Sequence, residues 1–173
     1  MTKKTMGLAL CGALLFAPLE WAQAASAPQN DQAFLKMAAE ADMTSAHLGQ
    51  MAETHAASDG VKDFGKKLVQ DHTSDYQQVA ELAAKLGDPI PKGIDSVDNR
   101  QISRLDRYKG AAFDRAFLAH ETVEHQRLVS AFKQEAEHGN DPAVKAYAGK
   151  TLPALESHLH DGQDLLKAKK PHA

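Results

Sequence analysis

The sequence predicts an all-α fold, built as a bundle of four long helices. Three observations support this prediction. Apolar residues recur at helical spacing over four long segments, and glycine, proline and capping residues separate these segments. The chain has 173 residues, which suits one domain. Its 43% hydrophobic and 25% charged residues are ordinary values for a globular protein.

The first two helices are predicted from their apolar stripes and from the residues between them. The first helix covers about residues 31–55 and the second about residues 61–86. Residues 58–60, Ser-Asp-Gly, break the first stripe and offer an N-cap for the second helix. Gly87 is typical of a helix C-cap, and Pro89 follows shortly after it.

A long connection follows the second helix. Residues 88–110 lack strong periodicity, although Ile102, Leu105 and Tyr108 indicate one short helix inside them. About 23 residues can cross the full length of a bundle roughly 40 Å tall, which a plain up-down bundle does not need. The long connection between helices two and three therefore predicts a ferritin-like four-helix bundle.

The last two helices have clear end signals. The third covers about residues 111–138 and ends at Gly139. Asp141 then caps the fourth helix, with Pro142 at its first position, where proline is well tolerated. This helix reaches about residue 167.

The N-terminus predicts export. Two lysines, an apolar run at residues 6–19 and Ala-Gln-Ala at residues 22–24 are typical of a secretory signal peptide. The only cysteine, Cys11, lies in this segment, so the exported domain forms no disulfide. We expect a periplasmic or secreted protein with no transmembrane segment after cleavage. The expected divisions are a signal peptide (1–24), a disordered leader (25–30), the bundle domain (31–167) and a flexible tail (168–173).

Polar residues interrupt the inward face of three helices at a similar height. His72, His125 and His158 occupy inward positions near the middle of helices two, three and four. Glu121 stands one turn before His125, and Ser45 lies at the matching height on the first helix. Three imidazoles and a carboxylate at one level form a candidate site for iron, zinc or copper, with these histidines and Glu121 as ligands.

The same polar layer has a structural interpretation, which the sequence favours. Buried histidines can form hydrogen bonds to neighbouring side chains or to a trapped water without binding a metal. The Glu-x-x-His motif of di-iron bundles is absent, because Val69 and Leu155 occupy its glutamate positions. Asp71, Asp75 and Glu124 are nearby in sequence and are candidate acceptors for the second nitrogen of each ring.

Several short motifs resemble those of an exported bacterial family, domain of unknown function 4142. These motifs are Phe34-Leu35 with Leu48-Gly49, VKDFGKKLVQDH at residues 61–72, GAAFD at 110–114, Glu124-His125, and LPALESHL at 152–159. The resemblance implies a ferritin-like bundle in the bacterial envelope and implies no particular reaction. Members of the family often carry glutamate where this chain has Ser45, so one ligand is lost if that glutamate helps to form a site.

Three functions are compatible with these patterns. The first is a non-enzymatic envelope protein, linked to stress, whose histidine layer is structural. The second is a metal-binding or redox protein that uses the histidine and glutamate cluster. The third is a helical interaction module for another envelope protein. The formal net charge of −3 shows no basic excess, so nucleic acid is not an expected partner. No Ser-His-Asp order, phosphate loop or pair of catalytic acids is evident, which disfavours an enzyme.

Overall fold

The structure is a computed structural model that describes residues 30–168. The predicted signal peptide, residues 25–29 of the leader and residues 169–173 of the tail lie outside the described residues, and the predictions made for them stay untested. Asn30, the last residue of the predicted leader, belongs to the folded domain. Its side-chain oxygen accepts hydrogen bonds from the backbone N–H groups of Gln32 and Ala33, and so caps the first helix.

The described residues form an all-α protein, as predicted. They contain five helices and no strand. The first predicted helix has the expected bounds. The other three long helices begin and end within two residues of their expected positions. The helices are α1 (Asp31–His55), α2 (Asp59–Leu86), α3 (Ser96–Leu105), α4 (Gly110–His138) and α5 (Pro142–Ala168). No helix among the described residues is long and apolar enough to cross a lipid bilayer.

Two of the predicted end signals are confirmed. Gly87 ends α2 in the left-handed conformation, with a φ of 76°, which glycine adopts without steric cost. Asp141 accepts hydrogen bonds from the backbone N–H groups of Ala143 and Val144, so its side chain caps α5 ahead of Pro142.

The start of α2 is stabilised differently from the expectation. Ser58 occupies the N-cap position, but its side chain makes no capping hydrogen bond in the described structure. Instead, the buried carboxylate of Asp114 in α4 accepts from the backbone N–H groups of Ala57 and Ser58, at 2.9 and 3.2 Å. The last residue of the GAAFD motif therefore ties the α1–α2 turn to α4.

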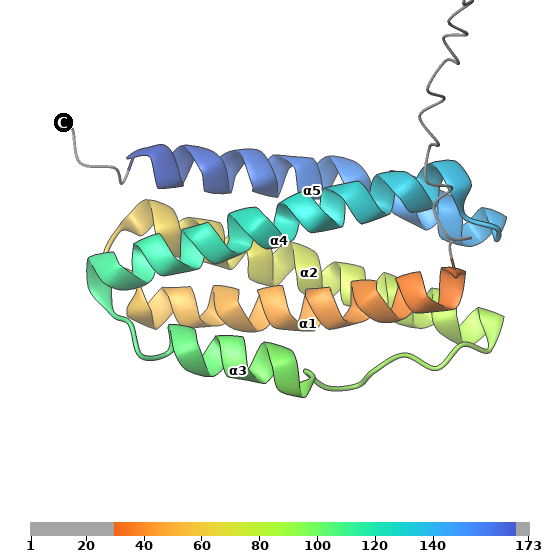
Figure 1. Cartoon of the computed structure of the whole chain (residues 1–173), viewed down its shortest axis with the longest axis horizontal. Helices are drawn as coiled ribbons and strands as arrows, with labels where there is room; N and C mark the ends of the chain where they lie inside the picture. The colour runs from red at the N-terminus through yellow and green to blue at the C-terminus, as the bar shows by residue number, and fades with distance from the viewer. Residues whose placement is uncertain (1–29, 169–173) are drawn as a thin grey trace, which may run out of the picture.

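The long connection between α2 and α4 runs back along the length of the molecule (Figure 1). As a result, α2 and α4 point in the same direction (Figure 1). Helix α3, which is part of this connection, lies beside α1 and buries Ile102 and Leu105. Tyr108 lies beyond the end of α3 and is exposed. The Tyr76 hydroxyl donates to the carbonyl of Pro91 and holds the connection against α2.

The long helices pack as two antiparallel pairs. Helix α1 packs chiefly against α2, and α4 packs chiefly against α5, with fewer contacts between the pairs. The first pair approaches closely at Gly49 and Gly65, where a Cβ atom on Gly49 would lie 2.5 Å from the carbonyl oxygen of Gly65. Glycine at these positions therefore allows α1 and α2 to pack closely.

Two separate apolar cores fill the part of the molecule formed by residues 30–168. One includes Phe34, Phe132 and Tyr147, whose rings meet edge-on or tilted. The other includes Phe113 and Phe117, whose rings stack with centroids 5.4 Å apart. The three buried histidines belong to neither core, which leaves a polar layer in the interior.

Candidate metal centre

Three buried histidines from three helices meet in this layer. His72 comes from α2, His125 from α4 and His158 from α5, with exposed fractions of 2%, 0% and 2%. One nitrogen from each ring lies within 4.8 Å of the corresponding nitrogens of the other two. The sequence predicted that these residues share a height and an inward direction, and the structure brings them into one cluster.

The closest pair already has the spacing of two metal ligands. The Nε2 atoms of His72 and His125 are 3.3 Å apart. Two nitrogens bound to zinc at the usual distance of about 2.0–2.1 Å, in tetrahedral geometry, are also separated by about 3.3 Å. This pair therefore needs little movement to share an ion.

The other nitrogen of each ring contacts an oxygen. Nδ1 of His72 lies 2.8 Å from Oδ1 of Asp42, and Nε2 of His158 lies 2.7 Å from Oδ2 of Asp71. Nδ1 of His125 lies 2.9 Å from the backbone carbonyl oxygen of Glu121. Because a carbonyl oxygen only accepts, Nδ1 of His125 carries the proton and its Nε2 keeps a lone pair. Oxygen acceptors of this kind orient most metal-binding histidines.

The Nδ1 nitrogen of His158 is left without a hydrogen-bond partner among the described residues. This atom is buried. A buried polar atom that makes no hydrogen bond is destabilising, by about 1–3 kcal/mol, unless another group satisfies it. An ion bound at this nitrogen would satisfy it.

Glu121 belongs to the layer but not to the three-nitrogen cluster. Its Oε2 atom lies 3.4 Å from Nδ1 of His125 and 3.5 Å from the Ser45 hydroxyl, which donates to it. The carboxylate therefore lies on the Nδ1 side of the His125 ring, and the group that could hold an ion among the described residues is the three histidines. Ser45, which the sequence placed at the height of this layer, does reach it through its hydrogen bond to Glu121.

Burial sets the charge of these groups. It lowers the pKa of His72 to about 4 and that of His125 to about 3, where the neighbouring histidines add to the effect. Burial also lowers the pKa of His158. All three rings are thus neutral at pH 7, the form that binds metals. Burial raises the pKa of the Glu121 carboxyl to about 8 and raises that of Asp42 well above its ordinary value.

A proton can replace the ion in this geometry. If Asp42 is protonated, it donates to Nδ1 of His72, and the Nε2–H of His72 then donates to the lone pair of His125. This chain satisfies two of the rings without a metal. It leaves Nδ1 of His158 unsatisfied, because no donor in the described chain reaches that atom.

Sequence reasoning missed Asp42 and only partly identified the other acceptors. Asp42 stands three residues before Ser45, hence on the same face of α1, and this spacing was the available signal. Of the three acidic candidates, Asp71 does contact a histidine, whereas Asp75 accepts from Tyr147 and Thr151 instead. Glu124 pairs with Arg127 at the surface.

The fold and this site define a class: an all-α protein with a buried three-histidine cluster between two apolar cores. The chain belongs to the family named domain of unknown function (DUF4142), whose sequence model matches residues 17–165. The predicted resemblance is therefore confirmed. No curated protein and no solved structure matches the chain.

Proposed function

We propose that this protein binds one divalent transition-metal ion through His72, His125 and His158. One observation carries the proposal: one nitrogen from each of three buried, neutral rings lies within 4.8 Å of the others, and each ring also contacts an oxygen through one of its nitrogens. If the layer served only to form hydrogen bonds inside the fold, Nδ1 of His158 would be expected to have a hydrogen-bond partner, and none is present among the described residues.

The donor set indicates which ions fit. Neutral imidazoles suit zinc, copper and iron, and three protein ligands leave one position for water or another small ligand. The position of Glu121 outside the cluster removes the carboxylate that would favour manganese. Asp42 and Asp71 act on their histidines as orienting acceptors rather than as ligands.

The proposed fold class is a ferritin-like four-helix bundle. The support is the parallel direction of α2 and α4, which the long connection makes possible, together with the antiparallel pairs α1–α2 and α4–α5 (Figure 1). Helix α3 is then an insertion in the crossover rather than a fifth member of the bundle.

The proposed location is the periplasm or the outside of the cell. Its support is the signal-like composition of residues 1–24 and the resemblance to exported proteins. A link to envelope stress and an interaction with another envelope protein remain predictions. The large apolar side chains exposed in the described chain add no support for an interaction surface, because they are spread over different segments: Leu86, Val97, Tyr108 and Val123.

A structural polar layer is the second candidate function. The observation that favours it is the 3.3 Å contact between His72 and His125, which a proton satisfies as well as an ion does. In that case Asp42 holds the proton that starts the chain, and the layer fixes how the helices pack.

Metal analysis distinguishes the two functions. The mature protein, purified without chelator, should contain close to one equivalent of a transition metal, or take up one equivalent of added zinc, iron or copper. Alanine variants of His72, His125 and His158 should each lose this binding. His47→Ala and His160→Ala are the matched controls, because both side chains are outside the cluster. A parent protein that binds none of the three metals would overturn the proposal in favour of the structural layer.

A further inference from the structure

Two clefts in the described part of the chain reach the ring of His72 from different sides. The larger, about 530 Å³, lies between α1, α2 and the connection near Gly93 and Ile94. The smaller, about 220 Å³, lies between α2 and α5. Since His72 is a ligand in the proposed centre, these clefts are two candidate routes from solvent to the ion.

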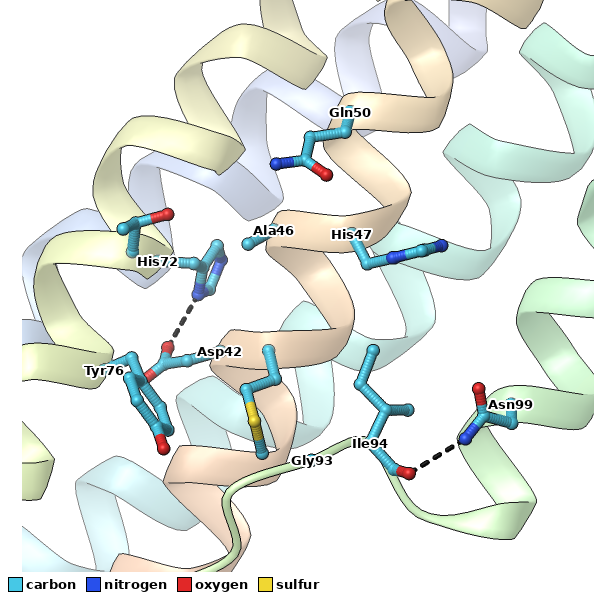
Figure 2. A pocket seen from close by; sticks show the side chains of 11 residues that line it. Asp42, Ala46, His47, Gln50, His72, Tyr76, Gly93, Ile94 and Asn99 are labelled. Carbon is cyan, nitrogen blue, oxygen red and sulfur yellow. Dashed lines mark hydrogen bonds and ion pairs between the residues drawn. The ribbon is translucent and has the colours of Figure 1, made fainter.

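The larger cleft meets His72 on its outward side. It contacts only one of the three histidines, and the carboxylate of Asp42 occupies the Nδ1 side of that ring (Figure 2). The nitrogen that faces His125 is Nε2, on the opposite side of the ring. An ion in this cleft would have to pass the Asp42–His72 pair, which is almost completely buried.

The smaller cleft meets two of the three histidines together. His72 and His158 both line it, so this cleft borders two of the proposed ligands. Asp71, which holds the outward nitrogen of His158, also lines it, and its side chain is 36% exposed. The partner of His158 is thus reachable from solvent, whereas the partner of His72 is not.

We propose that the α2–α5 cleft is the entrance through which the divalent cation, and then one small anion, reaches the three-histidine centre. This inference rests on the metal-binding function proposed above. The carboxylates of Asp71 and Asp75 attract a cation into the cleft. Asp71 is the partly exposed carboxylate of this cleft and is a positioning residue for His158.

The size and rim of the cleft limit which ligand can enter after the ion. Drug-sized ligands occupy sites of about 300–1,000 Å³, so a cleft of about 220 Å³ suits a hydrated ion or a ligand of a few atoms. Lys150 lies at the cleft with its Nζ atom 2.7 Å from Oε1 of Gln78. A positive side chain there, with three neutral ligands around a divalent ion, favours an anion at the remaining position.

The test compares variants that narrow one cleft or the other. Ala154→Phe and Ser74→Phe narrow the α2–α5 cleft from its two helices, and both native side chains are exposed. Ala46→Phe and Thr73→Phe are the matched controls in the larger cleft. Thr73 and Ser74 are neighbours in α2, so Thr73→Phe and Ser74→Phe differ chiefly in which of the two clefts the new side chain fills. Thermal melts establish which variants are folded, and two variants per cleft keep the comparison available if one fails to fold.

Cobalt(II) is the probe, because its visible absorption reports its ligands. We expect Ala154→Phe and Ser74→Phe to take up cobalt about tenfold more slowly than the parent, with unchanged stoichiometry, and to bind azide about tenfold more weakly. The two controls should match the parent. Equal rates in all four variants, or slowing only in the controls, would overturn the entrance while leaving the metal site intact. A parent that binds no cobalt, zinc, iron or copper overturns both proposals.

Discussion

The polar layer and the two apolar cores differ in how well their buried side chains satisfy one another. In the cores, buried side chains satisfy each other: Phe34 meets Phe132, and Phe113 stacks on Phe117. In the layer, Oδ2 of Asp42, Oε1 of Glu121 and Nδ1 of His158 are buried without any hydrogen bond from residues 30–168. The contrast indicates that the cores supply the stability of the fold, and that the unsatisfied polar atoms of the layer reduce it.

Breaking a core should have the largest effect. Phe117→Ala removes a fully buried ring from the stack with Phe113 and should lower the free energy of unfolding by about 3–5 kcal/mol. Urea unfolding of the metal-free protein measures it. Tyr108→Ala, at an exposed side chain, is the control. A loss for Phe117→Ala no larger than the control's would mean that the cores do not carry the stability.

Filling the layer should stabilise the whole molecule. Zinc that binds only the folded state at a free concentration 100 times its dissociation constant should raise the free energy of unfolding by about 2.7 kcal/mol. His125→Ala should abolish this gain, and His47→Ala should keep it. The measurement is the melting temperature with and without zinc. If zinc leaves the parent's melting temperature unchanged, the layer is not a metal site.

Disturbing an acceptor should weaken the site without removing a ligand. Asp42→Asn keeps an oxygen beside His72 but removes its charge, and should weaken zinc binding by about 10–100-fold. Competition with a chelator of known affinity gives the value. Asp161→Asn, at a partly exposed carboxylate paired with Lys67, is the control and should bind as the parent does. Equal affinities for both variants would argue against an orienting role for Asp42.

Acid and base should both weaken the metal-free protein, for different reasons. Burial lowers the pKa of His72, His125 and His158 below 6.5, so below that pH the unfolded chain binds more protons and stability falls with falling pH. The raised pKa values of Glu121 and Asp42 act oppositely: the folded state keeps those protons, so stability falls as pH rises from about 4.5 towards 8.

The free energy of unfolding should therefore peak near pH 6.5 and decrease by roughly 1–2 kcal/mol at pH 5 and at pH 8. Glu121→Gln should flatten the alkaline side and steepen the acid side, because the contribution of this carboxyl changes over the whole range from about pH 4.5 to 8. Urea unfolding from pH 5 to 8 tests this. A constant free energy over the range would indicate that these groups titrate as they do in the unfolded chain.

Helix positions were accessible to sequence reasoning because they depend on local rules. Apolar spacing, Gly87 and Asp141 located the long helices, and the height and phase of His72, His125 and His158 followed from 1.5 Å of rise per residue. These features need no knowledge of how one helix is placed against another.

The features that the sequence missed depend on the fit between helices. The sequence placed Ser45 at the height of the histidines, but the residue of α1 that contacts His72 is Asp42, which precedes Ser45 by three residues. That contact depends on how α1 packs against α2, which local sequence patterns do not specify. Glu121 had the predicted inward phase, but its side chain turned to the Nδ1 side of His125. The role of Asp114 in holding the α1–α2 turn likewise arises only from tertiary contact.

The pairing of the helices gives the centre a mechanical consequence. His72 belongs to the α1–α2 pair, whereas His125 and His158 belong to the α4–α5 pair, and packing between the pairs is sparser than within them. An ion held by all three rings would cross-link the α1–α2 pair to the α4–α5 pair. Loss of the ion would then weaken the packing between the two helix pairs while leaving each pair intact. The supply of metal would therefore control how stably the two pairs remain associated.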